Sequence, residues 1–165
     1  MIAARFWQPR PRMSEITVLI ASKSSSSRAK LEEQLAGNRR IRIVGDAAED
    51  SEIRAMTTLH YPDVLVLHIS SLGEPQQELL KQLHHIHPFL KILALECSPE
   101  HVRTSFIQLS AWGLRGCICH WKNSGELVEA IHTIMDGEFY LCPVASHALV
   151  DAYRHMIHRP VREKA

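Results

Sequence analysis

Five side chains able to do chemistry stand directly after short apolar runs of the chain. They are Ser22, Lys23, His68, Glu96 and His120. Brought together, a hydroxyl, an ammonium, two imidazoles and a carboxylate would suit transition-metal binding, phosphoryl transfer through a histidine, or an internal ion pair between Lys23 and Glu96. Each residue also has a plainer explanation, because a buried strand ends in a polar residue where the chain reaches solvent.

A metal site is the sharpest of these alternatives. His68, Glu96 and His120 form a two-histidine, one-carboxylate set of the kind that binds transition metals. However, Lys23 would repel a cation, and Cys117, three residues before His120, points to the other face of a strand. We therefore expect no metal and no cofactor. A phosphoryl-carrying His68 is disfavoured further, because a strand end offers neither an exposed helix position nor a docking face for a donor protein.

Short apolar runs rich in Ile, Val and Leu predict the buried strands that position these side chains. The runs are 16–21, 41–45, 64–67, 91–95 and 116–119. Apolar residues at helical spacing follow each run and predict a helix after each strand. The segment 143–156 predicts a sixth, partly amphipathic helix.

This alternation predicts an α/β fold, with a parallel sheet covered by helices on both faces. At this length we expect a flavodoxin-like (βα)5 doubly wound sheet with strand order 2-1-3-4-5, followed by a C-terminal linker helix. Parallel strands end at one edge of the sheet, and ligands bind there. The five polar residues should therefore line one crevice.

Composition limits the class of protein. The chain has 165 residues, of which 45% are hydrophobic and 22% charged, and its formal net charge is +1. These values are typical of one globular domain and argue against a strongly basic nucleic-acid binder. No apolar run approaches the length of a membrane span, and four irregularly spaced cysteines indicate a reduced, cytoplasmic protein.

Histidines are frequent, and three of them, His84, His85 and His87, fall at the end of a predicted helix. Only His84 and His87 share a face there, and two ligands do not close a structural metal site. We predict a solvated helix end, where cationic side chains are favourable.

Several landmarks occur in a characteristic order. They are Ile16-Thr-Val-Leu-Ile-Ala21 with Arg28 beyond it, Pro62-Asp63-Val-Leu-Val-Leu67, Gly113-Leu-Arg-Gly116 and Gly137-Glu-Phe-Tyr-Leu141. In spacing and sequence they resemble the receiver domain of bacterial response regulators, in particular the NarL/FixJ (LuxR-type) subfamily. The resemblance covers about residues 15–155. It implies a flavodoxin-like fold and a place in two-component signal transduction or a phosphorelay.

The chemistry of that family is not matched. Its receivers carry an acidic pair after the first strand, a phosphoaccepting aspartate, a threonine or serine, and a lysine. Here the corresponding positions hold Ser22 and Lys23, then His68, Glu96 and His120. The family's pocket has three carboxylates and one ammonium, and Mg²⁺ balances its negative charge. The five residues of this chain have a formal charge of zero when the imidazoles are neutral. We therefore expect a degenerate phosphorylation pocket, with no catalytic residue and no Mg²⁺.

The resemblance also marks a switch position and an interface. The family's switch aromatic falls on Cys117, which with Cys119 we expect to be a small buried residue. The region of the fourth and fifth helices is a common dimer face in receivers, so Trp112, Trp121 and Phe106 are interface candidates. An exposed Trp121 would favour that interpretation.

We divide the chain into a disordered N-terminal tail (1–14), a receiver-like domain (15–137) and a linker helix with a basic tail (138–165). Regulators of this subfamily continue into a helix-turn-helix domain. Because the sequence stops at Ala165, we expect no such domain and no direct sequence-specific DNA binding.

The expected function is therefore that of a cytoplasmic pseudo-receiver that is not an enzyme and does not contact membranes. It would act independently of phosphorylation in signal transduction or transcription regulation. Its partner would be a second copy, another response regulator or another signalling protein. The alternative is a small-ligand or transition-metal sensor that uses the crevice at His68, Glu96 and His120.

Overall fold

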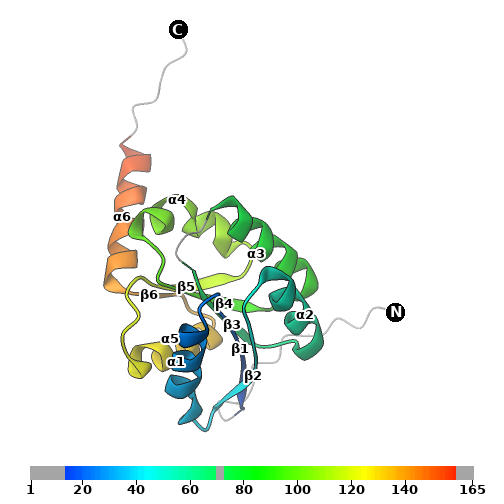
Figure 1. Ribbon diagram of the computed structural model, residues 1–165. Coiled ribbons are helices and arrows are strands. Elements are labelled where there is room, and N and C mark those ends of the chain that lie inside the picture. The colour runs from blue at the N-terminus through cyan, green and yellow to red at the C-terminus, as the bar shows by residue number, and fades with distance from the viewer. Residues whose placement is uncertain (1–13, 70–72, 159–165) are drawn as a thin grey trace.

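Strands and helices alternate along the chain around one sheet (Figure 1). The computed structural model describes residues 14–69 and 73–158. Its elements are β1 Ile16–Ala21, α1 Ser25–Ala36, β2 Ile41–Ala47, α2 Asp50–His60, β3 Val64–His68, α3 Glu74–Ile86, β4 Lys91–Leu95, α4 Pro99–Ser110, β5 Leu114–Ile118, α5 Ser124–Met135, β6 Tyr140–Leu141 and α6 Pro143–Ile157.

The sheet formed by the described residues has six strands in the order β2-β1-β3-β4-β5-β6, and all of its pairings are parallel. The predicted α/β fold and the order 2-1-3-4-5 are confirmed. The central strand β3 is buried from Val64 to Leu67, as expected for a parallel strand covered on both faces. The sixth strand, β6, extends the predicted order beside β5.

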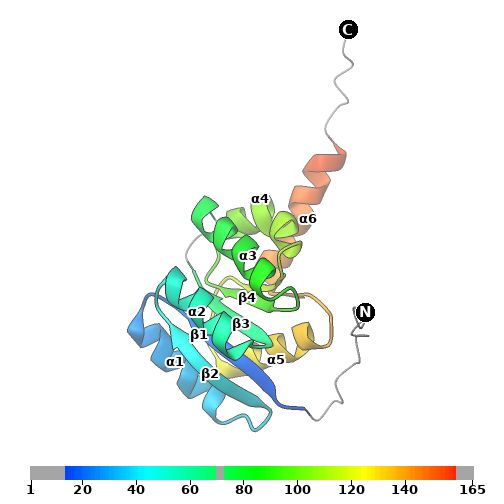
Figure 2. The same ribbon diagram turned by 90° about the vertical axis from the view of Figure 1, so that its right-hand side faces the viewer.

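Helices cover both faces of the sheet. Apolar side chains of α1 and α5 share one core cluster with the sheet, and those of α2, α3, α4 and α6 share the other. Figures 1 and 2 show the same division, with α1 and α5 together below the sheet and α3 and α4 above it. The strand ends that form the candidate site are thus held between two packed helical layers.

The predicted C-terminal helix is present as α6, and it packs beside α4. Ala145 and Ala148 of α6 are buried. The guanidinium of Arg103 on α4 lies 3.2 Å from the carboxylate of Asp151 on α6. The end of α6 extends away from the body in both views (Figures 1 and 2). The tail predicted at 1–14 and the basic end of 138–165 lie largely outside the described residues.

The prediction of a solvated histidine cluster is wrong for His87, which is buried. Its ring stacks on Tyr61, with centroids 3.5 Å apart, and its Nε2 is hydrogen-bonded to the carbonyl oxygen of Pro62 at 2.7 Å. Burial lowers the pKa of His87 below its ordinary value. The turn beneath the ring explains the difference, because Tyr61 adopts a left-handed conformation that closes α2.

No helix in 14–69 or 73–158 combines the length and the apolar composition that crossing a membrane requires.

Candidate functional site

The crevice lies where β1, β3, β4 and β5 end, since parallel strands present their carboxyl ends at one edge of the sheet. Ser22 follows β1, His68 ends β3 and Glu96 follows β4. The chain turns differently at each of these points, and those turns decide which side chains meet.

Ser22 and His68 are in direct contact. A hydrogen bond of 3.0 Å joins Ser22 Oγ to His68 Nδ1, and the serine is only 3% exposed. The backbone N–H of Ser24 also donates to Ser22 Oγ, at 3.2 Å. The hydroxyl is thereby hydrogen-bonded on both sides, so Ser22 and His68 satisfy each other.

Trp121 closes the crevice over this pair. Its ring meets that of His68 edge to face, with centroids 6.1 Å apart. The indole N–H donates to Gln34 Oε1 on α1 at 2.7 Å, and the ammonium of Lys30 lies 4.5 Å from the ring centroid. Trp121 is therefore fixed by α1 on one side and touches the histidine on the other.

The carboxylate of Glu96 holds the loop that follows β5 and carries Trp121. The backbone N–H of Trp121 donates to Glu96 Oε1 at 2.8 Å, and the N–H of Glu96 itself donates to the carbonyl of Ile118 at 2.8 Å. Its φ of +61° lies in the left-handed region, which costs a side chain of this size on the order of 1–3 kcal/mol. This conformation persists because hydrogen bonds on both sides fix it.

Lys23 and His120 do not join this network. Both are exposed. The hypothesised ion pair between Lys23 and Glu96 is not formed, since none of the ion pairs found within 14–69 and 73–158 joins these two residues. The structure therefore brings together Ser22 and His68, and joins them through Trp121 to Glu96.

A cation that the sequence interpretation did not assign to the site stands beside Ser22. Arg28 of α1 donates from Nη1 to the carbonyl oxygen of Ser22 at 2.6 Å and from Nε to Asp46 Oδ2, next to the end of β2, at 3.0 Å. One signal for this contact is the position of Arg28 one helical turn after the N-cap, Ser24.

No group of three or more His, Cys, Asp or Glu residues within the described ranges lies close enough to hold a metal ion. The set His68, Glu96 and His120 is thus not assembled. His120 is exposed, whereas Glu96 is turned toward the backbone of Trp121.

Cysteines gather behind the crevice, and all four are free and buried. The sulfurs of Cys97 and Cys117 are 3.7 Å apart. Hydrogen bonding to Cys97 and burial raise the pKa of Cys117, and burial raises that of Cys119 to about 12. At neutral pH these thiols are protonated, so Cys117 and Cys119 behave as small core residues.

Two interface candidates need correction. Trp121 is only 7% exposed and Phe106 is also buried, so neither offers a surface to a partner in this structure. The indole of Trp121 is hydrogen-bonded to Gln34 on α1, and Phe106 lies on the core face of α4. The exposed Trp121 that would favour the interface interpretation is therefore not found.

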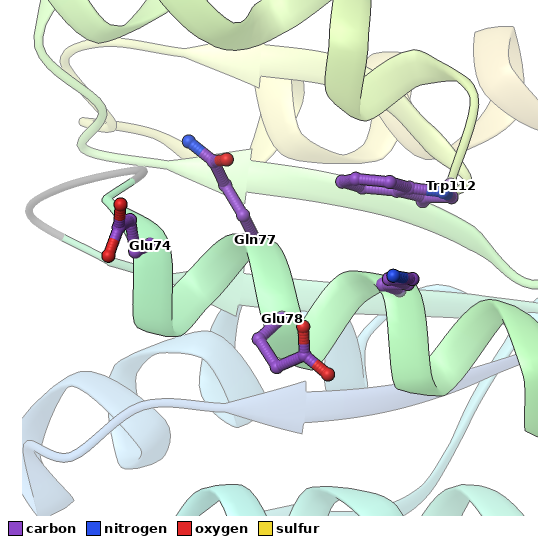
Figure 3. Close-up of a pocket in the computed structure, with 5 residues that line it drawn as sticks. Glu74, Gln77, Glu78 and Trp112 are labelled. Carbon is purple, nitrogen blue, oxygen red and sulfur yellow. The ribbon is translucent and has the colours of Figure 1, made fainter.

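Trp112 remains accessible. It is half-buried at the end of α4 and lines a surface pocket of about 350 Å³. Figure 3 shows its ring at one end of the pocket and the side chains of Glu74, Gln77 and Glu78, from α3, along it. The pocket is separate from the crevice residues and mixes charges with an aromatic face.

Sequence comparisons find similarity to a transcriptional regulatory protein and to a response regulator. No protein-family model matches it. It is 20% identical over 152 residues to the transcriptional regulatory protein DegU of Brevibacillus brevis, which covers 92% of this chain and 64% of DegU. It is 24% identical over 136 residues to the response regulator GacA of Pseudomonas protegens, covering 82% and 62%. The chain thus spans less than two thirds of both relatives.

The similar solved structures are of response regulators or of their receiver domains. The isolated receiver domain of RcsB from Salmonella enterica, in the presence of a beryllofluoride phosphomimetic, superposes with a TM-score of 0.69 at 17% identity, covering 82% of this chain and 99% of that one. A LuxR-family two-component response regulator from Aurantimonas gives 0.73 at 16% identity, covering 86% and 99%. RcsB dimers bound to DNA give 0.69 at 16% identity, covering 83% and 69%. This chain therefore has the α/β fold of a response-regulator receiver domain.

Proposed function

We propose that this chain is a phosphorylation-independent pseudo-receiver that acts in bacterial signal transduction through protein–protein contact rather than as an enzyme. The observation that carries the proposal is the Ser22–His68 hydrogen bond at the place where receivers hold an acid and the phosphoaccepting aspartate. The crevice contains a neutral hydroxyl and an imidazole bonded to each other, where a phosphoryl group and its metal would need carboxylates.

Electrostatics around the crevice support this proposal. Arg28 lies against the carbonyl of Ser22, and Lys23 is adjacent in sequence. Two cationic residues beside Ser22, and no carboxylate at Ser22, Lys23 or His68, make this end of the sheet unfavourable for Mg²⁺. Glu96, the only carboxylate among the five positions, accepts a backbone hydrogen bond from Trp121.

The partner we propose is a second copy of the chain or another response regulator, with the complex formed in the cytoplasm. Dimers of RcsB are found on DNA in one of the similar structures. For this chain we propose no direct, sequence-specific DNA contact by the described residues, and regulation by abundance or by partner binding rather than by a phosphoryl group.

The test is the association state of the full chain, with and without acetyl phosphate and Mg²⁺. Analytical ultracentrifugation over a range of concentrations should give the same association curve in both conditions. A curve that shifts toward the dimer only when both donor and metal are present would contradict the proposal. A donor-treated sample without Mg²⁺ is the matched control, because phosphoryl transfer to a receiver requires the metal.

A further inference from the structure

The last two turns of α6 carry an apolar surface with no partner in the described part of the chain. Val150, Tyr153, Met156 and Ile157 are between 54% and 66% exposed. We call these four residues the α6 apolar face. Figures 1 and 2 show that this end of α6 extends beyond the layer formed by α4. Exposed apolar side chains gathered in this way mark interaction sites.

The spacing of these residues places them on one side of the helix. Each residue turns an α-helix by 100°, so Val150, Tyr153 and Ile157, at i, i+3 and i+7, form a narrow stripe. Met156 extends this stripe toward the buried alanines. Polar residues line the flank of the stripe that lies away from Met156. They are His147, Asp151, Arg154, His155 and His158.

The chain itself already uses a different side of α6. Ala145 and Ala148 are buried against the body, and the Arg103–Asp151 ion pair fixes the helix to α4. These contacts hold α6 in place and leave the α6 apolar face pointing away from the core. A surface that is ordered before binding loses little conformational entropy when a partner arrives.

The composition of the stripe favours a matching helix as its occupant. It follows the a-d-a pattern of a coiled coil, and its two a positions, Val150 and Ile157, are β-branched, which favours two-stranded over higher-order coiled coils. No charge interrupts the stripe. In a parallel pair Arg154, at an e position, would face Leu149 of the other helix, a g position, whereas an antiparallel pair would bring two Arg154 side chains together.

We propose that the α6 apolar face binds the same face of a second copy of this chain, as a parallel two-helix contact about a twofold axis. This inference rests on the proposed function, because it names the surface through which association would occur. Four side chains on two helical turns cover less than the roughly 800 Å² per partner of a standard interface, which places the contact in the weak, reversible class rather than among obligate dimers.

The first experiment changes the stripe at its centre. Tyr153→Glu places two carboxylates against each other in the dimer, so the dissociation constant measured by analytical ultracentrifugation should rise at least about tenfold. Leu59→Glu, on α2, is the matched control, since Leu59 is an apolar residue outside α6 that is even more exposed than Tyr153. It should associate like the original chain. Circular dichroism verifies that both variants are folded.

The second experiment tests the orientation. All four natural cysteines are buried, so Tyr153→Cys would add an accessible thiol. With copper phenanthroline and oxygen accepting the two electrons, two such thiols should join as an intermolecular disulfide. His155→Cys, two residues on and therefore turned by about 200°, should not. Equal cross-linking of both variants, a chain that stays monomeric at every concentration, or a dimer unaffected by Tyr153→Glu would each overturn the inference.

These results separate the inference from the proposed function. A dimer that persists in Tyr153→Glu and ignores acetyl phosphate with Mg²⁺ removes the α6 contact but leaves the pseudo-receiver. If the original chain dimerises only with donor and metal, and Tyr153→Glu abolishes that dimer, the α6 contact stands and the pseudo-receiver proposal fails.

Discussion

Replacing Trp121 by alanine should strongly destabilise the fold, because the side chain belongs to the core and not to an interface. It is packed in the apolar cluster formed with α1 and α5. Truncation of a buried tryptophan to alanine typically costs about 3–5 kcal/mol of unfolding free energy. That range includes the loss of the 2.7 Å hydrogen bond to Gln34, which alone contributes about 0.5–1.5 kcal/mol.

The hydrogen bond can be separated from the packing. Trp121→Phe retains an aromatic ring but no N–H, and Gln34→Ala removes the acceptor. In a double-mutant cycle these two changes should show a coupling free energy of about 0.5–1.5 kcal/mol. Trp112→Ala is the control, because Trp112 is only half-buried, and it should cost less than Trp121→Ala.

The assay is guanidinium unfolding followed by far-ultraviolet circular dichroism, since the variants remove the fluorescent reporter itself. Equal slopes of free energy against denaturant would show that the variants unfold in the same manner. A loss below about 1 kcal/mol for Trp121→Ala, or a larger loss for Trp112→Ala, would refute the assignment of Trp121 to the core.

Two further predictions concern stability. The pKa of His87 is lowered by burial, so the unfolded chain binds a proton more readily, and the contribution of His87 to stability should fall as the pH drops below about 6.5, by at most about 1.4 kcal/mol per pH unit; His87→Phe should remove this part of the pH profile, and identical profiles would contradict it. Gly113→Ala should destabilise by at least about 1 kcal/mol, because φ is +97° and a Cβ would lie 2.7 Å from the carbonyl oxygen of Leu90. Thermal melts should show almost no change for Gly37→Ala, where φ is −79° and nothing lies within 4 Å.

The sheet was predictable because its strands are local apolar runs. Each of the five expected runs has a counterpart in the structure, with ends shifted by a few residues. β6 was not predicted, since Tyr140 and Leu141 are too few to show a period and form a strand only by pairing with β5. A long-range pairing of this kind leaves no local signal.

The position of the candidate site could be predicted from the sequence, but the contacts among its side chains could not. Strand ends identify which residues reach the edge of the sheet, and they identified Ser22 and His68 correctly as neighbours. The orientation of Glu96 depends on a left-handed backbone that residue type alone does not indicate. Trp121 is buried by Gln34, 87 residues earlier in the chain, so its environment could not be read from nearby residues.

The central claim is that the crevice no longer accepts a phosphoryl group or its metal. A titration with beryllofluoride and Mg²⁺, followed by NMR of the backbone amides around Ser22 and His68, tests it most directly. A variant with the family residues restored (Ser22→Asp, Lys23→Asp, His68→Asp, Glu96→Thr, His120→Lys) is the positive control. We predict no change in the original chain, whereas saturable, Mg²⁺-dependent shifts of those amides in the original chain would contradict the account.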